Sequence, residues 1–100
     1  TCEVHVYLTE LADGRLLATY SNYHLPLGVS AILSADAGQT WSNDAPLLLA
    51  MSGSYSVGWP VTLQLADGSL ITSYAATTYT EQAPEHVTCE VVRWRIPEGL

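Results

Sequence analysis

The sequence is short of charged side chains, and those it has are mostly acidic. Only 13% of its 100 residues are charged, and ten Asp and Glu residues face three arginines and no lysine, for a net charge of −7. A surface with this balance repels phosphate backbones and anionic lipid head groups. We therefore expect neither nucleic acid nor a membrane as a partner, and a neutral or weakly charged ligand instead.

Long apolar runs are also missing. The sequence has no apolar stretch of the roughly 18 residues that a transmembrane helix needs. Thr1 opens directly into a strand-like pattern, without the charged and apolar regions of a signal peptide. We expect no membrane span and no signal in these residues, and their compartment stays open. Because the chain does not begin with Met, we expect a processed product or a piece of a longer chain.

Metal-binding and cysteine patterns are equally sparse. His5, His24 and His86 are widely spaced, so we expect no metal site and no cofactor. Cys2 and Cys89 lie in the same word, Thr-Cys-Glu-Val, at residues 1–4 and 88–91. A disulfide is conceivable if these two segments run side by side, and two buried free thiols are the alternative.

Apolar residues, in contrast, are abundant. They make up 48% of the chain, and its mean hydropathy is +0.16. This composition argues against disorder, and 100 residues suffice for one small domain with one core. The apolar excess suggests that part of the surface is an interface.

The most informative motif is Ser-x-Asp-x-Gly-x-Thr-Trp at residues 34–41, which marks an Asp-box hairpin. Short oxygen-bearing side chains at its first and third positions accept hydrogen bonds from the turn's own amides. Glycine allows a positive φ, Thr starts a return strand, and the Trp ring anchors the loop from below. The five fixed residues are therefore predicted to be structural rather than catalytic: Ser34, Asp36, Gly38, Thr40 and Trp41.

Strand patterns recur along the chain with a fixed spacing. Two hairpins share an Ala-Asp-Gly turn, at residues 12–14 and 66–68, and a Tyr follows each Gly at the same distance. The offset from Asp13 to Asp67 is of propeller-blade size and indicates an internal duplication. Seven strands are predicted, at residues 4–9, 16–21, 29–34, 41–49, 61–65, 70–75 and 87–96.

The predicted fold class is therefore all-β, with antiparallel four-stranded propeller blades and no helix. Residues 1–100 form a single module, with one blade at about 1–50, Asp box included, and an incomplete second blade at about 55–97. Two blades cannot close a ring, because a free apolar face and a sheet edge would remain in water. We expect completion by missing sequence or by other copies of the chain, as a dimer or trimer.

Taken in order, the motifs resemble the last two blades of a sialidase-superfamily (BNR/Asp-box) six-bladed β-propeller. The resemblance rests on residues 11–20, on residues 28–34 running into the Asp box, on Gly-Trp-Pro-Val at 58–61, and on residues 65–70 and 90–97. It covers nearly the whole chain. It implies a glycan-processing ancestry and a family that is often secreted.

The catalytic residues of that family are not identifiable here. The resemblance implies three arginines that clamp a substrate carboxylate, a Tyr/Glu pair and an Asp acid/base. Arg15 sits in a hairpin turn and Arg93 and Arg95 lie two apart on one strand, so the three cannot converge within one chain. Residues 22–30, where relatives often carry arginines, have none. Whether the chain is an enzyme stays undecided at this point.

Sugar binding is the remaining possibility, since aromatic rings in loops and at strand entries commonly stack on sugar faces. The candidate glycan-contacting residues are Tyr23, Tyr55, Trp59 and Tyr79, with Arg95 from an Arg-Ile-Pro word typical of sialidases. Three hypotheses remain open. They are a sialidase-like module with part of a site, an oligomeric lectin-like protein, and a non-catalytic propeller fragment that folds by self-assembly.

Overall fold

The computed structural model describes residues 4–22, 28–42, 46–51, 56–78 and 86–98. These residues are all-β and include no helix. They form seven strands: β1 (Val4–Glu10), β2 (Leu16–Asn22), β3 (Gly28–Ser34), β4 (Leu47–Met51), β5 (Ser56–Gln64), β6 (Leu70–Thr78) and β7 (His86–Trp94).

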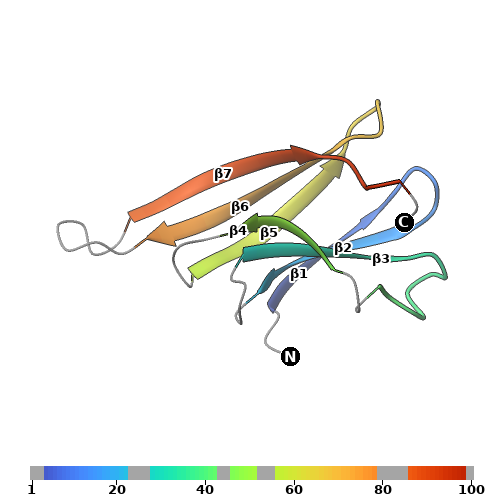
Figure 1. The fold of residues 1–100 in the computed structure, drawn as a ribbon, viewed down its shortest axis with the longest axis horizontal. Coiled ribbons are helices and arrows are strands. Elements are labelled where there is room, and N and C mark those ends of the chain that lie inside the picture. Colours follow the sequence, from blue (N-terminus) through green and yellow to red (C-terminus); the bar gives the residue numbers. More distant parts are fainter. Residues whose placement is uncertain (1–3, 23–27, 43–45, 52–55, 79–85, 99–100) are drawn as a thin grey trace.

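The strands form two antiparallel sheets, one of four strands in the order β1-β2-β3-β4 and one of three in the order β5-β6-β7 (Figure 1). Within each sheet, every strand pairs with the strand that follows it in sequence, as the hairpin turns predict. The predicted all-β class, the seven strands and the grouping into four and three are confirmed.

Two strand boundaries differ from those expected. The fourth strand begins at residue 47 rather than 41, because the Trp41 indole and the Ser42 backbone are bonded back to the Asp-box loop. The fifth strand begins at residue 56 rather than 61, because a β-bulge accommodates Pro60 within it. Proline fits there because β5 is an edge strand of its sheet.

The two Ala-Asp-Gly turns have the same geometry. In the first, Leu11 N–H donates to Arg15 O (2.8 Å), Gly14 N–H to Leu11 O (2.9 Å), and Arg15 N–H to Asp13 Oδ1 (3.0 Å). The second turn, at residues 65–69, repeats the three bonds at 2.8, 2.9 and 3.0 Å. The turn glycines have φ of +92° and +88°, which a residue with a Cβ adopts only at a cost.

The repeat extends to an irregularity in the strands. β1 carries a bulge at residues 5–6, opposite Tyr20, and β5 carries one at residues 59–60, opposite Tyr74. The two bulges are separated by the same offset as Asp13 and Asp67. The turn motif alone does not require a bulge. A bulge at the same place in both hairpins therefore supports a duplicated hairpin.

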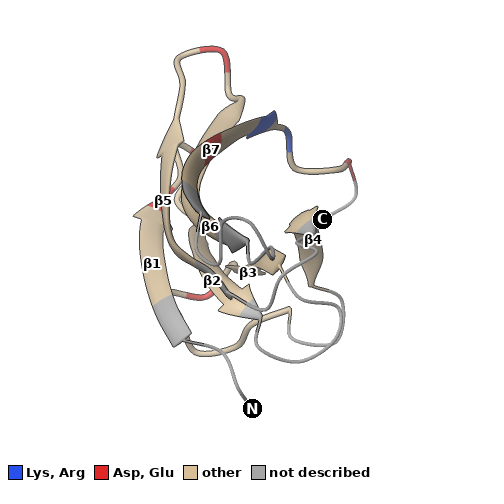
Figure 2. Ribbon diagram, turned by 90° about the vertical axis from the view of Figure 1, so that its left-hand side faces the viewer, with Lys and Arg blue, Asp and Glu red and all other residues tan. Residues whose placement is uncertain are grey.

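The two sheets pack face to face, with β5 lying over β1 and β2. Figure 2, turned by 90°, shows the first strands of the two sheets side by side. The core between the sheets is formed by Leu11, Leu17, Ala31 and Leu70, with a second cluster of Val29, Tyr74 and Ala76.

Hydroxyl groups occupy the middle of this interface. Thr62 Oγ1 donates to Thr19 Oγ1 (3.1 Å) across the sheets and lies 2.9 Å from Thr72 Oγ1 on the next strand. The Trp94 indole donates to Thr72 Oγ1 (2.9 Å), and Thr9 Oγ1 donates to the Thr62 carbonyl (3.2 Å). All of these hydroxyls are paired, so they join the sheets without a desolvation penalty.

Candidate functional site

The Asp box forms a closed network of its own side chains. Ser34 Oγ accepts the Gly38 N–H (2.9 Å) and donates to Asp36 Oδ1 (2.8 Å). Asp36 accepts the Thr40 N–H at Oδ1 (2.8 Å) and the Thr40 hydroxyl at Oδ2 (2.5 Å). The Trp41 indole donates to the Gly38 carbonyl (3.0 Å), which holds the ring against the loop.

Two residues of the box differ in detail from the sequence expectation. Thr40 does not start a strand. Its hydroxyl caps the Asp36 carboxylate instead. The positive φ expected of Gly38 (+91°) is shared by Ala37 (+61°).

The bonds to Asp36 set its protonation state. Hydrogen bonds from the Thr40 hydroxyl, the Thr40 N–H and Ser34 lower the pKa of Asp36 to about 2. A carboxyl with that pKa stays ionised and is a poor proton donor near neutral pH. All five residues therefore take part in the hydrogen bonds of the loop, and the structural role that the motif predicts stays a prediction.

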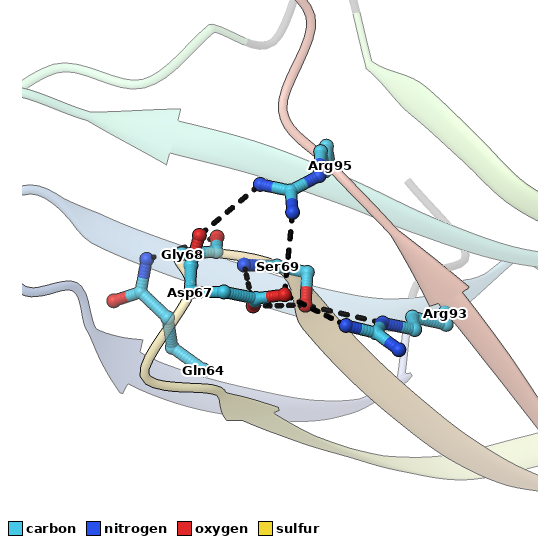
Figure 3. A network of polar contacts seen from close by, with 6 residues as sticks. All are labelled: Gln64, Asp67, Gly68, Ser69, Arg93 and Arg95. Carbon is cyan, nitrogen blue, oxygen red and sulfur yellow. Dashed lines mark hydrogen bonds and ion pairs between the residues drawn. The ribbon is translucent and has the colours of Figure 1, made fainter.

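A second carboxylate network lies at the turn of the second repeat (Figure 3). Asp67 Oδ1 accepts the Ser69 N–H (3.0 Å) and hydroxyl (2.6 Å). Its Oδ2 pairs with Arg93 Nη2 (2.8 Å) and Arg95 Nη2 (3.3 Å), and Arg95 Nη1 donates to the Asp67 carbonyl (3.2 Å). The bonds from Ser69, with the charges of the two guanidinium groups, lower the pKa of Asp67 to about 2.

This network accounts for the arginines. Arg15 pairs in the same way with Asp13 in the first turn (2.8 Å). The sequence contains three arginines, and each has the carboxylate of an Ala-Asp-Gly turn as partner. Arg95, the candidate from the Arg-Ile-Pro word, therefore contacts the Asp67 turn. Its guanidinium group pairs there with the Asp67 carboxylate.

Gln64 connects the two turns. Its Oε1 accepts the Ala12 N–H of the first turn (2.7 Å), and its Nε2 donates to the Gly68 carbonyl of the second (3.3 Å). The amide therefore fixes the two hairpin ends against each other. Nothing in the sequence pattern singled out this residue, because its role depends on how the sheets stack.

A shallow groove lies where the two bulges meet. It has a volume of about 270 Å³ and is lined by Val6 of β1 and by Trp59, Pro60 and Val61 of β5. Trp59 is 68% exposed and has a φ of +52°, a conformation that is uncommon for a residue with a Cβ. Trp59 is a candidate from the sequence, whereas the other residues that line the groove are not. The signal was Pro60, since a proline inside a strand pattern marks an edge or a bulge.

A Tyr/Glu pair, not identified from the sequence, forms between β6 and β7. The Tyr74 hydroxyl donates to Glu90 Oε1 (2.8 Å). Burial of the ring, together with the bond to Glu90, raises the pKa of Tyr74 to about 12. The hydrogen bond therefore joins β6 to β7 within one sheet, while the Tyr74 ring packs with Val29 of the other sheet.

The structure places the remaining candidates as follows. Tyr23, Tyr55 and Tyr79 lie outside the described residues, as do Cys2 and His24. Cys89 is a free, exposed thiol on β7. In the part of the chain that the structure describes, no three His, Cys, Asp or Glu side chains gather as metal ligands, and no helix is long and apolar enough to cross a membrane.

Comparison with protein-family models, with curated proteins and with solved structures finds no match to this chain.

Proposed function

We propose that the chain is a sialidase-like β-propeller module of the Asp-box type that carries no complete catalytic site of its own. The observation that carries this proposal is the repeated hairpin. The same turn, the same bulge and the same strand order occur twice, at the offset from Asp13 to Asp67, and the two sheets stack face to face. Consecutive meander sheets stacked in this way are the building principle of a propeller.

The arginines support a module without catalysis. A carboxylate clamp needs guanidinium groups whose charge is not already balanced by a carboxylate, and the three in this sequence are paired with Asp13 and Asp67. We expect no hydrolysis of a fluorogenic sialoside by the purified chain above the rate in buffer. Turnover that scales with protein concentration and survives repurification would contradict this part of the proposal.

A second function, binding of a neutral sugar in the groove at the bulges, is favoured by Trp59. A ring that is largely exposed and held in an uncommon backbone conformation costs stability, and such strain concentrates at binding sites. None of the described lining residues of the groove is charged. Stacking on the apolar face of an uncharged sugar suits this surface.

The test is a glycan array followed by titration of the best ligand. Trp59→Gly removes the ring and suits the positive φ, so it should abolish binding and shift the melting temperature by less than about 8 °C, the effect of roughly 1 kcal/mol. Trp59→Phe keeps a stacking ring and should retain part of the affinity. Val91→Ala, at an exposed apolar position on β7, serves as the control. Equal binding by the wild type and Trp59→Gly would remove the groove from consideration.

A further inference from the structure

Trp59 is carried by a stiff piece of backbone. The bulge of β5 places residues 59 and 60 opposite Tyr74, and Pro60 is buried next to the exposed indole. Proline fixes its own φ and leaves the residue before it few backbone conformations. A ligand that stacks on the indole therefore orders little backbone when it binds, which favours affinity.

The groove beside this ring is small. Its volume of about 270 Å³ lies below the roughly 300–1,000 Å³ of sites that enclose a drug-sized ligand. Trp59 is the single aromatic side chain among the described residues that line it. The groove thus offers one stacking platform, with the exposed side chains of Val6 and Val61 beside it. One sugar ring suits this space, and a second ring would have no platform there.

Charge also restricts the ligand. The described lining of the groove carries no charge, and the protein as a whole has a net charge of −7. The three arginines are paired with Asp13 and Asp67, at the hairpin turns. A sugar with a carboxylate would therefore meet a negative field without a cation to balance it. Charge complementarity favours an uncharged sugar.

The lining side chains can recognise few hydroxyl groups. Three of the four described lining residues are aliphatic, and the indole N–H of Trp59 is the single side-chain donor among them. A site that hydrogen-bonds a ligand hydroxyl discriminates strongly against an analogue without it, whereas an apolar surface discriminates weakly. The groove is therefore suited to the apolar face of a sugar rather than to the pattern of its hydroxyls.

We propose that the groove receives one uncharged pyranose ring at the exposed end of a glycan, with the C–H face of that ring on Trp59 and its edges beside Val6 and Val61. A terminal ring fits because a sugar inside a chain continues in two directions and needs a longer surface. The hydroxyl groups stay in water, so sugars that differ in hydroxyl configuration bind alike. This inference rests on the sugar binding proposed above and names the unit that is bound.

The first test is a titration of the isotope-labelled chain with methyl glucoside, methyl galactoside and methyl mannoside, followed by proton–nitrogen NMR. The protein has three indole N–H groups, and loss of one signal in Trp59→Phe assigns that of Trp59. Trp41 and Trp94 donate to other groups of the protein and serve as internal references. Only the Trp59 signal should shift, with dissociation constants of about 1–10 mM that agree within about 10-fold.

The second test varies the length and charge of the ligand. Cellotetraose should bind no more than about 3-fold tighter than methyl glucoside, and methyl glucuronide at least about 10-fold weaker. Val6→Lys places a cation at the wall of the groove, at an exposed position of an edge strand that tolerates lysine. It should bring the glucuronide within about 3-fold of the glucoside. Gln39→Lys adds the same charge on the exposed Asp-box loop and should leave the wild-type ratio unchanged.

The outcomes separate this inference from the function on which it rests. If no glycoside and no oligosaccharide shifts the Trp59 signal of the folded protein, sugar binding in the groove is wrong, and the inference with it. If cellotetraose binds through Trp59 more than about 10-fold tighter than methyl glucoside, sugar binding stands and the single terminal ring is wrong. Equal binding of glucoside and glucuronide by the wild type would overturn the argument from charge. A preference of about 100-fold for one of the three glycosides would overturn recognition by the apolar face alone. Far-UV circular dichroism checks the fold of each variant.

Discussion

Leu70 is the residue at which the stacking of the two sheets can be measured most directly. Its side chain is 0% exposed and packs with Leu11, Leu17 and Ala31 between the sheets. Replacing Leu70 by Ala removes three carbon atoms, worth about 2.5 kcal/mol of lost burial. The cavity left behind raises the expected loss to about 3–5 kcal/mol.

The repeat supplies a matched control. Leu16 is the counterpart of Leu70 in the first hairpin, but it is only half-buried, near Gly38 of the Asp-box loop. The same substitution there removes the same atoms with less burial, so we expect a loss below about 1.5 kcal/mol. The difference between the two variants therefore measures the sheet-to-sheet interface rather than the hairpin.

The assay is urea denaturation followed by tryptophan fluorescence and far-UV circular dichroism. The indole of Trp94, which packs against the Leu70 cluster, provides a local signal. Domains of this kind are stable by about 5–15 kcal/mol, so Leu70→Ala should lower the melting temperature by roughly 15–30 °C. Both variants are compared at one protein concentration, so that any difference in self-association between them does not enter the comparison. Equal losses at the two positions would refute the stacked arrangement.

Three further predictions concern single polar groups. Asp36→Asn should lower the melting temperature at neutral pH, and the gap from the wild type should narrow as the pH falls from about 4 to 2. The reason is that the pKa of Asp36 in the folded protein, about 2, lies below the ordinary value of 3.8. The ionised carboxylate therefore stabilises the fold above about pH 4, and this contribution is lost as the pH falls to about 2. A gap that is unchanged across an acid titration would contradict this. Thr72→Val leaves the Trp94 indole without its acceptor and should cost about 1–3 kcal/mol by chemical denaturation, whereas no loss would show that the hydroxyl is dispensable. The Ser21 hydroxyl is buried without a hydrogen-bond partner among the described residues, and its counterpart in the second repeat is Ala75, so Ser21→Ala should be neutral or stabilising by about 1 kcal/mol. A destabilised Ser21→Ala protein would reveal a partner for that hydroxyl.

Much of the local structure was predictable from the sequence. The Ala-Asp-Gly turns form as expected because their hydrogen bonds join residues at most four apart, and the Asp box closes through its own side chains for the same reason. The strands between them follow from period-two patterns and from the absence of a helical stripe. The limits of β4 and β5 were less accurate, since a bonded loop residue and a bulge shift a strand end without changing the pattern.

The sequence by itself determined the composition of the two repeats, their spacing and the chemistry of their turns, because those depend on neighbours along the chain. Only the tertiary structure decided which face of each sheet is covered, that Gln64 bridges two turns, and that Arg93 and Arg95 share one carboxylate. It also brought Val6 beside Trp59 to form the groove. Apart from the bond between Gln64 and Gly68, these contacts join residues that are 26 or more positions apart in the sequence. A sequence pattern records which side chains alternate but not which sheet will lie against them.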